Sequence, residues 1–282
     1  MTTQTAQALN VFKAKRWYQD RLLLAGVIIV GTALFLSVFG YIIAPYDPGT
    51  PVGPISQPPS REFWFGTDSS GLDVFSRVIT APRIDVVLSV SAALLSGLIG
   101  TLIGLGTGFY EGRFSSLVMR ISDVLQAFPI FILAMVLVAL TGRNLINLIF
   151  ALTFLYTPIF VRLTRTEVLT QKTRTYVEAA RATGNSEWKI ALKHVLPNSL
   201  TPSLIQLSVT VGFGILLTAG LSYIGAGVRP PTPEWGLMIA TSAPKLILGE
   251  WWASLFPGIA VSLTVFGFAS LGNALERRVS SQ

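Results

Sequence analysis

The chain has 282 residues, of which 51% are hydrophobic and 12% are charged, and its mean hydropathy is +0.61. Soluble domains carry about 25% charged residues, so this composition excludes an ordinary soluble protein and predicts an all-α membrane protein. The absence of cysteine excludes disulfides and thiolate metal sites, and a single histidine excludes a multi-histidine metal site. The net charge of +7 fits the basic loops of a membrane protein better than a nucleic-acid partner.

Six apolar segments approach or exceed the length of about 20 residues that a helix needs to cross a bilayer. The first is too long for the apolar part of a cleavable signal peptide and is predicted to remain a membrane helix. The six predicted spans are Leu22–Ala44, Val86–Tyr110, Val124–Leu140, Leu145–Val161, Leu200–Ile224 and Trp251–Leu275.

Most Lys and Arg residues lie in the segments between spans that share a side of the membrane with the N-terminus. Cytoplasmic loops of membrane proteins carry an excess of Lys and Arg, so both termini are predicted to be cytoplasmic. The predicted division is a cytoplasmic segment 1–21, a first membrane helix 22–44, an outside loop 45–85, a membrane core 86–275 that includes a cytoplasmic loop 170–199, and a cytoplasmic tail 276–282.

Two segments on the outside are rich in turn-forming residues. Pro45–Arg83 contains FWFGTDSSGLDVFSR, and a compact loop is predicted with turns at Gly66 and Gly71, where a positive φ costs least. Gly225–Glu250 contains RPPTPEWG, whose prolines predict a rigid, non-helical segment.

Few charges lie near the predicted spans. Asp85 and Asp123 fall at span ends, where a charge costs little, and Arg120 is spaced to pair with Asp123 on one helix face. No series of carboxylates runs through the spans, which argues against a proton-coupled carrier. Pro129 is placed to kink the third span. Close helix packing, most simply within the chain's own bundle, is predicted for the second span by glycines at 97, 100, 104, 106 and 108.

The longest charge-rich stretch in the chain is YVEAARATGNSEWKIALKHVLPN at 176–198. The run EAARA favours a helix, Gly184 suits the left-handed position just beyond a helix end, and Ser186 suits the start of a second helix. Pro197 either limits that helix or begins the next span. A helix–turn–helix knob is therefore predicted. The residues alone favour neither packing against the chain's own helices nor contact with another protein.

Five sequence patterns together carry a family resemblance. Glu178-Ala179-Ala180, Gly184 and Leu196-Pro197 have the spacing of the EAA loop in permease subunits of binding-protein-dependent ABC importers. FGTDSSGLDVFSR at 65–77, RISD with AFP at 120–129, PPTPEWG at 230–236 and LFPG at 255–258 are similar to other segments of the peptide/nickel branch. From about residue 17 to residue 275, the chain resembles the second, C-type permease of dipeptide and oligopeptide transporters.

The resemblance implies a type I importer permease with six transmembrane helices in a bacterial inner (plasma) membrane. It implies a heterodimer with a related permease, two cytosolic ABC ATPases that hold ATP and Mg²⁺, and an extracytoplasmic substrate-binding protein. The chain itself is expected to bind no cofactor and to catalyse no reaction. The lack of a GxxxxGK[ST] phosphate loop agrees with this expectation.

The resemblance also implies roles for individual residues. Glu178 would pair with a basic group on the ATPase, small residues would allow close seating of the loop 170–199, and glycine would permit the turn. The ATPase-coupling residues are then Glu178, Ala179, Ala180, Ala182, Gly184, Leu196 and Pro197. Contacts with the binding protein are expected in the two outside segments, at Gly66, Asp68, Asp73, Pro231, Glu234 and Trp235.

Several functions stay open at this point. Di- and oligopeptides are the expected substrates, with nickel chelates, glutathione, opines or another small solute as alternatives within the class. A stand-alone secondary transporter and a membrane scaffold without transport are alternatives of other classes. Missing charges within the spans and the long helix-forming knob argue against a secondary transporter.

Overall fold

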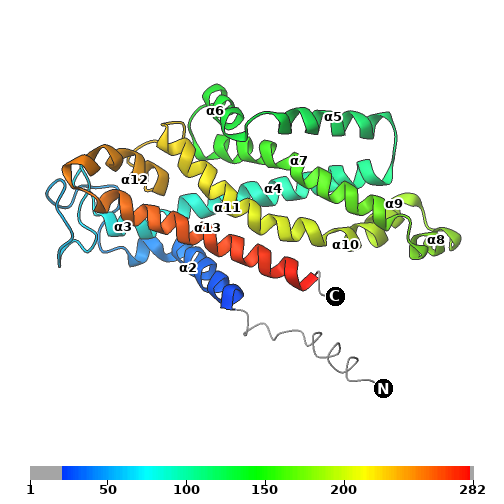
Figure 1. Cartoon of the computed structure of the whole chain (residues 1–282), viewed down its shortest axis with the longest axis horizontal. Coiled ribbons are helices and arrows are strands. Elements are labelled where there is room, and N and C mark those ends of the chain that lie inside the picture. Colours follow the sequence, from blue (N-terminus) through cyan, green and yellow to red (C-terminus); the bar gives the residue numbers. More distant parts are fainter. Residues whose placement is uncertain (1–20, 280–282) are drawn as a thin grey trace, which may run out of the picture.

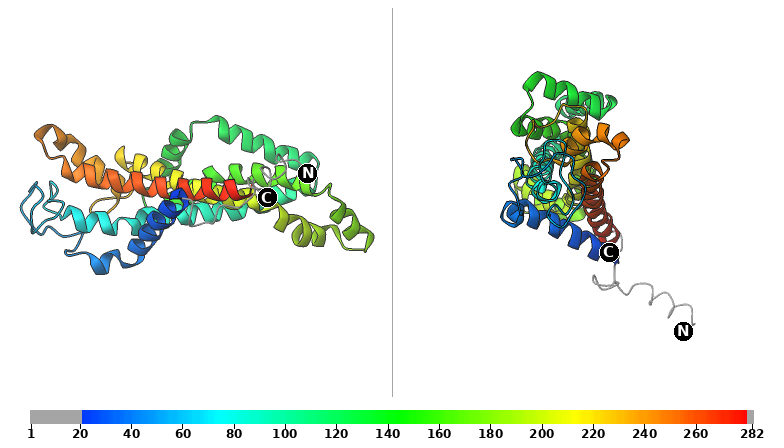
Figure 2. Two further views of the ribbon diagram at one scale, coloured as in Figure 1. Left: turned by 60° about the horizontal axis from the view of Figure 1, so that its bottom comes forward. Right: turned by 90° about the vertical axis from the view of Figure 1, so that its left-hand side faces the viewer.

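The computed structural model describes residues 21–279, so most of the predicted terminal segments 1–21 and part of 276–282 lie outside the described residues. Figures 1 and 2 show an elongated bundle of long helices, without any strand in the described part of the chain. The helices are α2 (Arg21–Ile43), α3 (Val74–Thr80), α4 (Pro82–Phe109), α5 (Arg113–Ala127), α6 (Ile130–Thr141), α7 (Leu145–Gln171), α8 (Thr175–Ala182), α9 (Glu187–Ile190), the π-helix η2 (Ala191–Val195), α10 (Leu196–Ser199), α11 (Thr201–Tyr223), α12 (Trp235–Ser242), the 3₁₀ helix η3 (Ala243–Leu248) and α13 (Trp252–Val279).

Five of the predicted spans are helices long and apolar enough to cross a membrane, counted over residues 21–279. The exception is Val124–Leu140, which was predicted as one span but is divided between two helices. There α5 and α6 meet at a bend of 96° and form a span only if the two are taken together. Pro129 lacks an N–H, and Phe128 before it has the extended backbone that a following proline favours (φ −83°, ψ 143°). Figure 1 shows α5 and α6 along one side of the bundle, where α6 packs against α7 and α11.

Helices α4 and α7 lie side by side and make the most extensive helix contact in the described chain (Figure 1). Glycines spaced four residues apart line one face of α4, as helical periodicity requires. A Cβ atom added at Gly104 would lie 2.7 Å from the carbonyl oxygen of Val161, and one at Gly108 would lie 2.9 Å from that of Arg165. Gly106, on another face, has open space around it. The glycines on the first face therefore allow α4 to pack closely against α7 within the chain's own bundle.

The ion pair predicted within α5 is wrong. Asp123 instead pairs with Arg162 of α7, with 2.5 Å between Oδ1 and Nη2. Both side chains are about half exposed, so the pair contributes little to stability. Its effect is to join α5 to α7 across the opening between them.

The two turn-rich segments contain more helix than predicted. Gly66 and Gly71 do have positive φ, at 73° and 74°, which confirms both turns. The first segment, however, ends in α3, where the Asp73 carboxylate accepts from the Ser76 N–H at 2.8 Å and begins the helix. In the second segment, the non-helical prediction holds up to Glu234 and is wrong beyond it. The prolines of PPTP all lie before α12, so none of them interrupts that helix.

Gly104→Ala is expected to destabilise the folded protein, because the added Cβ would force α4 away from the backbone of α7. Overpacking of this kind costs about 1–3 kcal/mol. Gly106→Ala is the matched control, since it makes the same change on the same helix in open space. Thermal unfolding in detergent should show a lowered midpoint for Gly104→Ala only. Equal midpoints for the two variants would contradict the packing role of the glycine face.

Candidate functional site

The predicted knob lies at one end of the bundle and comprises α8, α9, η2 and α10. Figure 1 shows it at the opposite end from α3 and α12. We call these the knob end and the loop end, the latter formed by residues 44–85 and 225–250. The two ends hold all the residues that the sequence singles out as candidate contacts.

The turn in the knob has the predicted geometry. Gly184 has φ of +80°, its N–H bonds to the Arg181 carbonyl at 2.9 Å, and the Asn185 N–H reaches back to the Ala180 carbonyl at 3.2 Å. These two bonds close the end of α8 in a Schellman motif. The Arg181 guanidinium also pairs with the Glu187 carboxylate through two contacts of 2.8 and 3.0 Å, which joins α8 to α9 across the turn.

Pro197 does not end the second helix of the knob. Helical structure continues from α9 through η2 to Ser199. The Leu196 N–H bonds to the Ala191 carbonyl five residues earlier, and this wider turn accommodates a proline that has no N–H to donate. Leu196 is half-buried and Pro197 is exposed.

One face of the knob packs against the chain's own helices. Ala180 is only 8% exposed, and its neighbours on this face are apolar and fully buried. This cluster joins the knob to the ends of α4 and α7 and consists of Leu105, Phe109, Val168, Val177, Ala180, Ile190, Ala191 and Val195. Ala180 is therefore committed within the chain and does not offer its side chain to a partner.

The opposite face of the knob is open to solvent. Glu178, Ala179 and Ala182 are exposed, and the Trp188 side chain is 61% exposed. Within the described residues Glu178 makes no ion pair. Aromatic residues are enriched at protein–protein contacts, so the exposed Trp188 ring on this firmly packed support marks the knob as a candidate contact surface.

At the loop end, a buried arginine draws separate segments together. The Arg77 guanidinium of α3 donates to the Pro48 carbonyl at 2.7 Å and the Pro231 carbonyl at 3.0 Å. It also lies 3.9 Å from the Asp68 carboxylate. Since a buried guanidinium needs acceptors for its N–H groups, these contacts fix the first loop against the PPTP segment.

Most of the residues predicted to contact a binding protein are buried within the chain. A Cβ at Gly66 would lie 2.8 Å from the Trp252 ring, and the Trp235 indole donates to the Val78 carbonyl at 3.0 Å. Asp73 and Glu234 are likewise enclosed, each at the start of a helix. Of the six, Pro231 is exposed and Asp68 is partly exposed. Side-chain contact with a partner is thus limited to these two.

The structure brings together two carboxyl groups that sequence analysis treated separately. Glu234 accepts from the Gly236 and Leu237 N–H groups at 3.0 and 2.6 Å, and the Trp235 N–H donates to Asp85 Oδ2 at 3.1 Å. Both carboxyl groups are fully buried and contact each other. Asp85 does lie at the start of its helix, but the expectation that a charge costs little there is wrong, because the side chain is buried beneath Trp235 and Glu234. Burial raises the pKa of Glu234.

Comparison with known proteins identifies the family of this chain. Residues 100–281 match the family model described as "Binding-protein-dependent transport system inner membrane component". The chain belongs to this family. It is therefore a multi-pass protein of the bacterial inner membrane, and the family is one of transport permeases that work with ATPase and binding-protein components. This confirms the predicted class, fold and location.

The permease is similar to two curated relatives over most of its length. "Glutathione transport system permease protein GsiD" of Pectobacterium atrosepticum is 34% identical over 264 residues, which are 93% of this chain and 87% of the relative. "Probable D,D-dipeptide transport system permease protein DdpC" of Escherichia coli is 35% identical over 256 residues, 90% and 86% of the two chains. A solved structure of the MetNI methionine ABC transporter in inward-facing conformations has a TM-score of 0.52 and 22% identity, covering 69% of this chain and 94% of that one.

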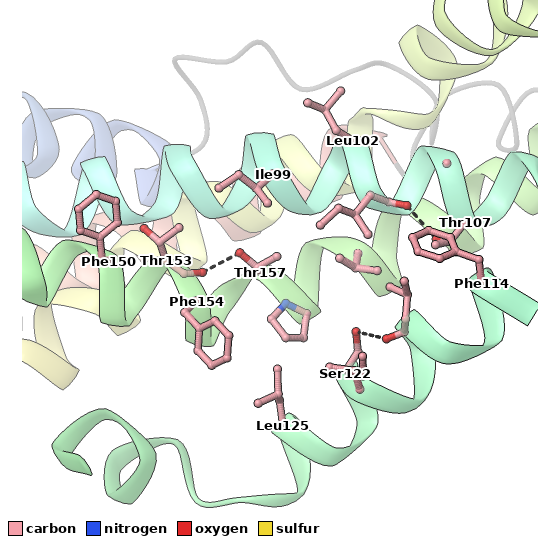
Figure 3. Close-up of a pocket in the computed structure, with 16 residues that line it drawn as sticks. Ile99, Leu102, Thr107, Phe114, Ser122, Leu125, Phe150, Thr153, Phe154 and Thr157 are labelled. Carbon is pink, nitrogen blue, oxygen red and sulfur yellow. Dashed lines mark hydrogen bonds between the residues drawn. The ribbon is translucent and has the colours of Figure 1, made fainter. Parts of the chain in front are cut away.

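The permease has an apolar groove of about 650 Å³ between α4, α5 and α7 (Figure 3). Its labelled hydroxyl groups are largely satisfied within their own helices: Thr107 donates to the Ile103 carbonyl at 2.9 Å and Ser122 to the Val118 carbonyl at 2.9 Å. No charged side chain lines it. The groove therefore offers apolar packing area and no recognition of a charged solute.

Gly184→Ala is expected to weaken the knob, because a side chain at φ +80° costs about 1–2 kcal/mol. Gly184→Asn is the matched control, since asparagine tolerates the left-handed region and the site has open space. Hydrogen exchange of the α8 amides should speed up more in Gly184→Ala than in Gly184→Asn. The same exchange in both variants would show that the turn does not depend on backbone conformation at this position.

Proposed function

We propose that this permease forms half of the pathway of an ATP-driven importer and that cytosolic ATPases move it through the knob. The observation that carries the proposal is the two-faced construction of the knob. Its inner face is held by apolar packing to α4 and α7, and its outer face is exposed. A force applied to the outer face is therefore passed to the two helices that pack most closely in the bundle.

Glu178 is the proposed ionic contact with the ATPase. It is exposed and has no ion-pair partner within the described chain, so its charge is available to a basic group. Ala179 and Ala182 are exposed and small, so a partner can approach Glu178 closely. The exposed Trp188 ring adds apolar area to the knob. In this arrangement the knob faces the cytoplasm, as the distribution of Lys and Arg favours, and the loop end faces the binding protein.

The proposed substrates are small peptides, with glutathione among them. The support is the similarity to permeases that are named for glutathione and D,D-dipeptide transport. The apolar groove of this chain offers no charged group to a peptide terminus, so selection is assigned to the binding protein. We further propose that a related permease completes the pathway as a heterodimer.

Glu178→Ala is expected to abolish uptake and the stimulation of ATP hydrolysis by substrate-loaded binding protein, while the variant still inserts in the membrane. Glu187→Ala is the matched control. It removes an equally exposed carboxylate from the same knob, but one whose partner, Arg181, lies in this chain and whose loss costs little. Uptake should be measured in membranes with matched permease levels. Intact uptake by Glu178→Ala would overturn the proposed coupling role.

A bulky side chain on the exposed or on the buried face of α8 should distinguish an effect on ATPase docking from an effect on folding. Ala179→Trp is expected to block co-purification with the ATPases and leave the unfolding midpoint unchanged, because the residue is exposed. Ala180→Trp should lower the midpoint instead, since it would overpack the buried face of the knob. Pull-down in mild detergent with mass spectrometry reports the partners. A wild-type chain that comes down alone would contradict the proposed assembly.

A further inference from the structure

The carboxyl groups of Asp85 and Glu234 meet at the loop end, although they come from distant parts of the chain. Asp85 lies in the first turn of α4, and Glu234 begins α12. Neither side chain has any exposed surface, and the two carboxyl groups lie at consecutive backbone N–H groups, Asp85 at that of Trp235 and Glu234 at that of Gly236. Neither residue has a role in the coupling proposed for the knob.

The donors around the pair are too few for two negative charges. Three backbone N–H groups, from residues 235, 236 and 237, reach three of the four carboxyl oxygens, and the Ser222 hydroxyl faces Glu234. The fourth, Asp85 Oδ1, has no donor among the described residues. An ionised carboxylate can only accept hydrogen bonds, so a bond between two carboxyl groups requires a proton on one of them. Two adjacent buried carboxylates without a cation would also repel each other.

Several other charged groups of the loop end are engaged elsewhere. The Arg77 guanidinium of α3 is committed to backbone carbonyls and to Asp68. The Asp73 carboxylate begins α3 by accepting from the Ser76 N–H. Arg83 is exposed and stacks over the Tyr41 ring of α2, 5.1 Å from its centroid. The neighbouring helix α11 presents a neutral side chain here, Ser222.

We propose that Asp85 and Glu234 form a proton-binding site that holds one proton while the start of α12 is seated against the first turn of α4, and releases it when the two part. Separation admits water, in which Asp and Glu ionise with ordinary pKa values of about 3.9 and 4.3. The proton leaves to the surrounding solution, and no bond between heavy atoms changes. The raised pKa of Glu234 in the packed arrangement agrees with this linkage.

The linkage has a definite sign. The packed arrangement binds one proton more than the separated one, so lowering the pH favours packing and raising the pH favours separation. The equilibrium between them should change by about tenfold per pH unit wherever the packed pair holds the proton and the separated pair does not. This goes beyond the proposed function, because it applies at the loop end whether or not an ATPase engages the knob.

Infrared spectroscopy of the complete transporter in nanodiscs tests for the proton directly. At neutral pH exposed carboxyl groups are ionised, so the wild type should show the C=O stretch of a protonated, buried carboxyl group. This band should shift in D₂O and be lost in Asp85→Asn, whose amide can donate to Glu234 without a titratable proton. Absence of the band in the wild type, or its persistence in both Asp85→Asn and Glu234→Gln, would overturn the proposal.

Cysteine labelling tests the link to helix separation. The chain has no cysteine, so Met238→Cys reports exposure of α12, where the native side chain is 4% exposed, and Ile247→Cys at a 92% exposed position corrects for thiol reactivity. The ratio of their maleimide labelling rates should rise with pH in the otherwise unchanged protein and stay flat with Asp85→Asn added. A flat ratio without Asp85→Asn, or an equal rise with it, would show that opening is not linked to this proton.

Discussion

The close approach of α4 and α7 is the constraint on which the rest of the structure depends. It exists because glycines face the backbone of α7 at spacings of one helical turn, and a side chain at those positions would meet carbonyl oxygens or backbone atoms. Helix α4 also runs from the loop end to the knob end of the molecule. Its first turn holds Asp85, and its last turns hold Leu105 and Phe109, which pack the knob. A displacement of the knob therefore reaches the loop end through one tightly packed pair of helices.

Local features of the knob could be predicted from sequence because short-range chemistry determines them. Gly184 takes the left-handed backbone that closes α8, as its position after EAARA indicates. The choice between inner packing and outer contact could not be predicted, because it depends on which side of α8 meets α4 and α7. The structure divides adjacent alanines between the two: Ala180 is buried and Ala179 is exposed. Helical periodicity alone does not say which face is inward when both carry small residues.

Long-range features escaped sequence analysis for the same reason. Hydropathy located the apolar segment 124–140, but the 96° bend at Pro129 depends on where α6 packs. Asp85 and Glu234 looked like separate charges at the edges of apolar segments. They come together because α12 packs against α11 and α13 and brings its first residue, Trp235, to the first turn of α4. The Trp235 indole bonds to Val78 of α3 there. Glu234 fell in a segment predicted to be non-helical, and nothing in the sequence identified Asp85 as its partner.

The two ends of the bundle differ in the forces that hold them, and this difference suits a transporter. Apolar side chains fix the knob to α4 and α7, and each such side chain stabilises the contact by about 1.5–3 kcal/mol because water cannot replace its neighbours. The loop end also has an apolar core, which includes Val78, Trp235 and Met238. It adds hydrogen bonds from Arg77, Trp235 and Glu234, and water can take over such bonds when the segments part. The net contribution of a hydrogen bond is about 0.5–1.5 kcal/mol. These hydrogen bonds are therefore the part of the loop end's packing that water can replace when movement begun at the knob reaches it.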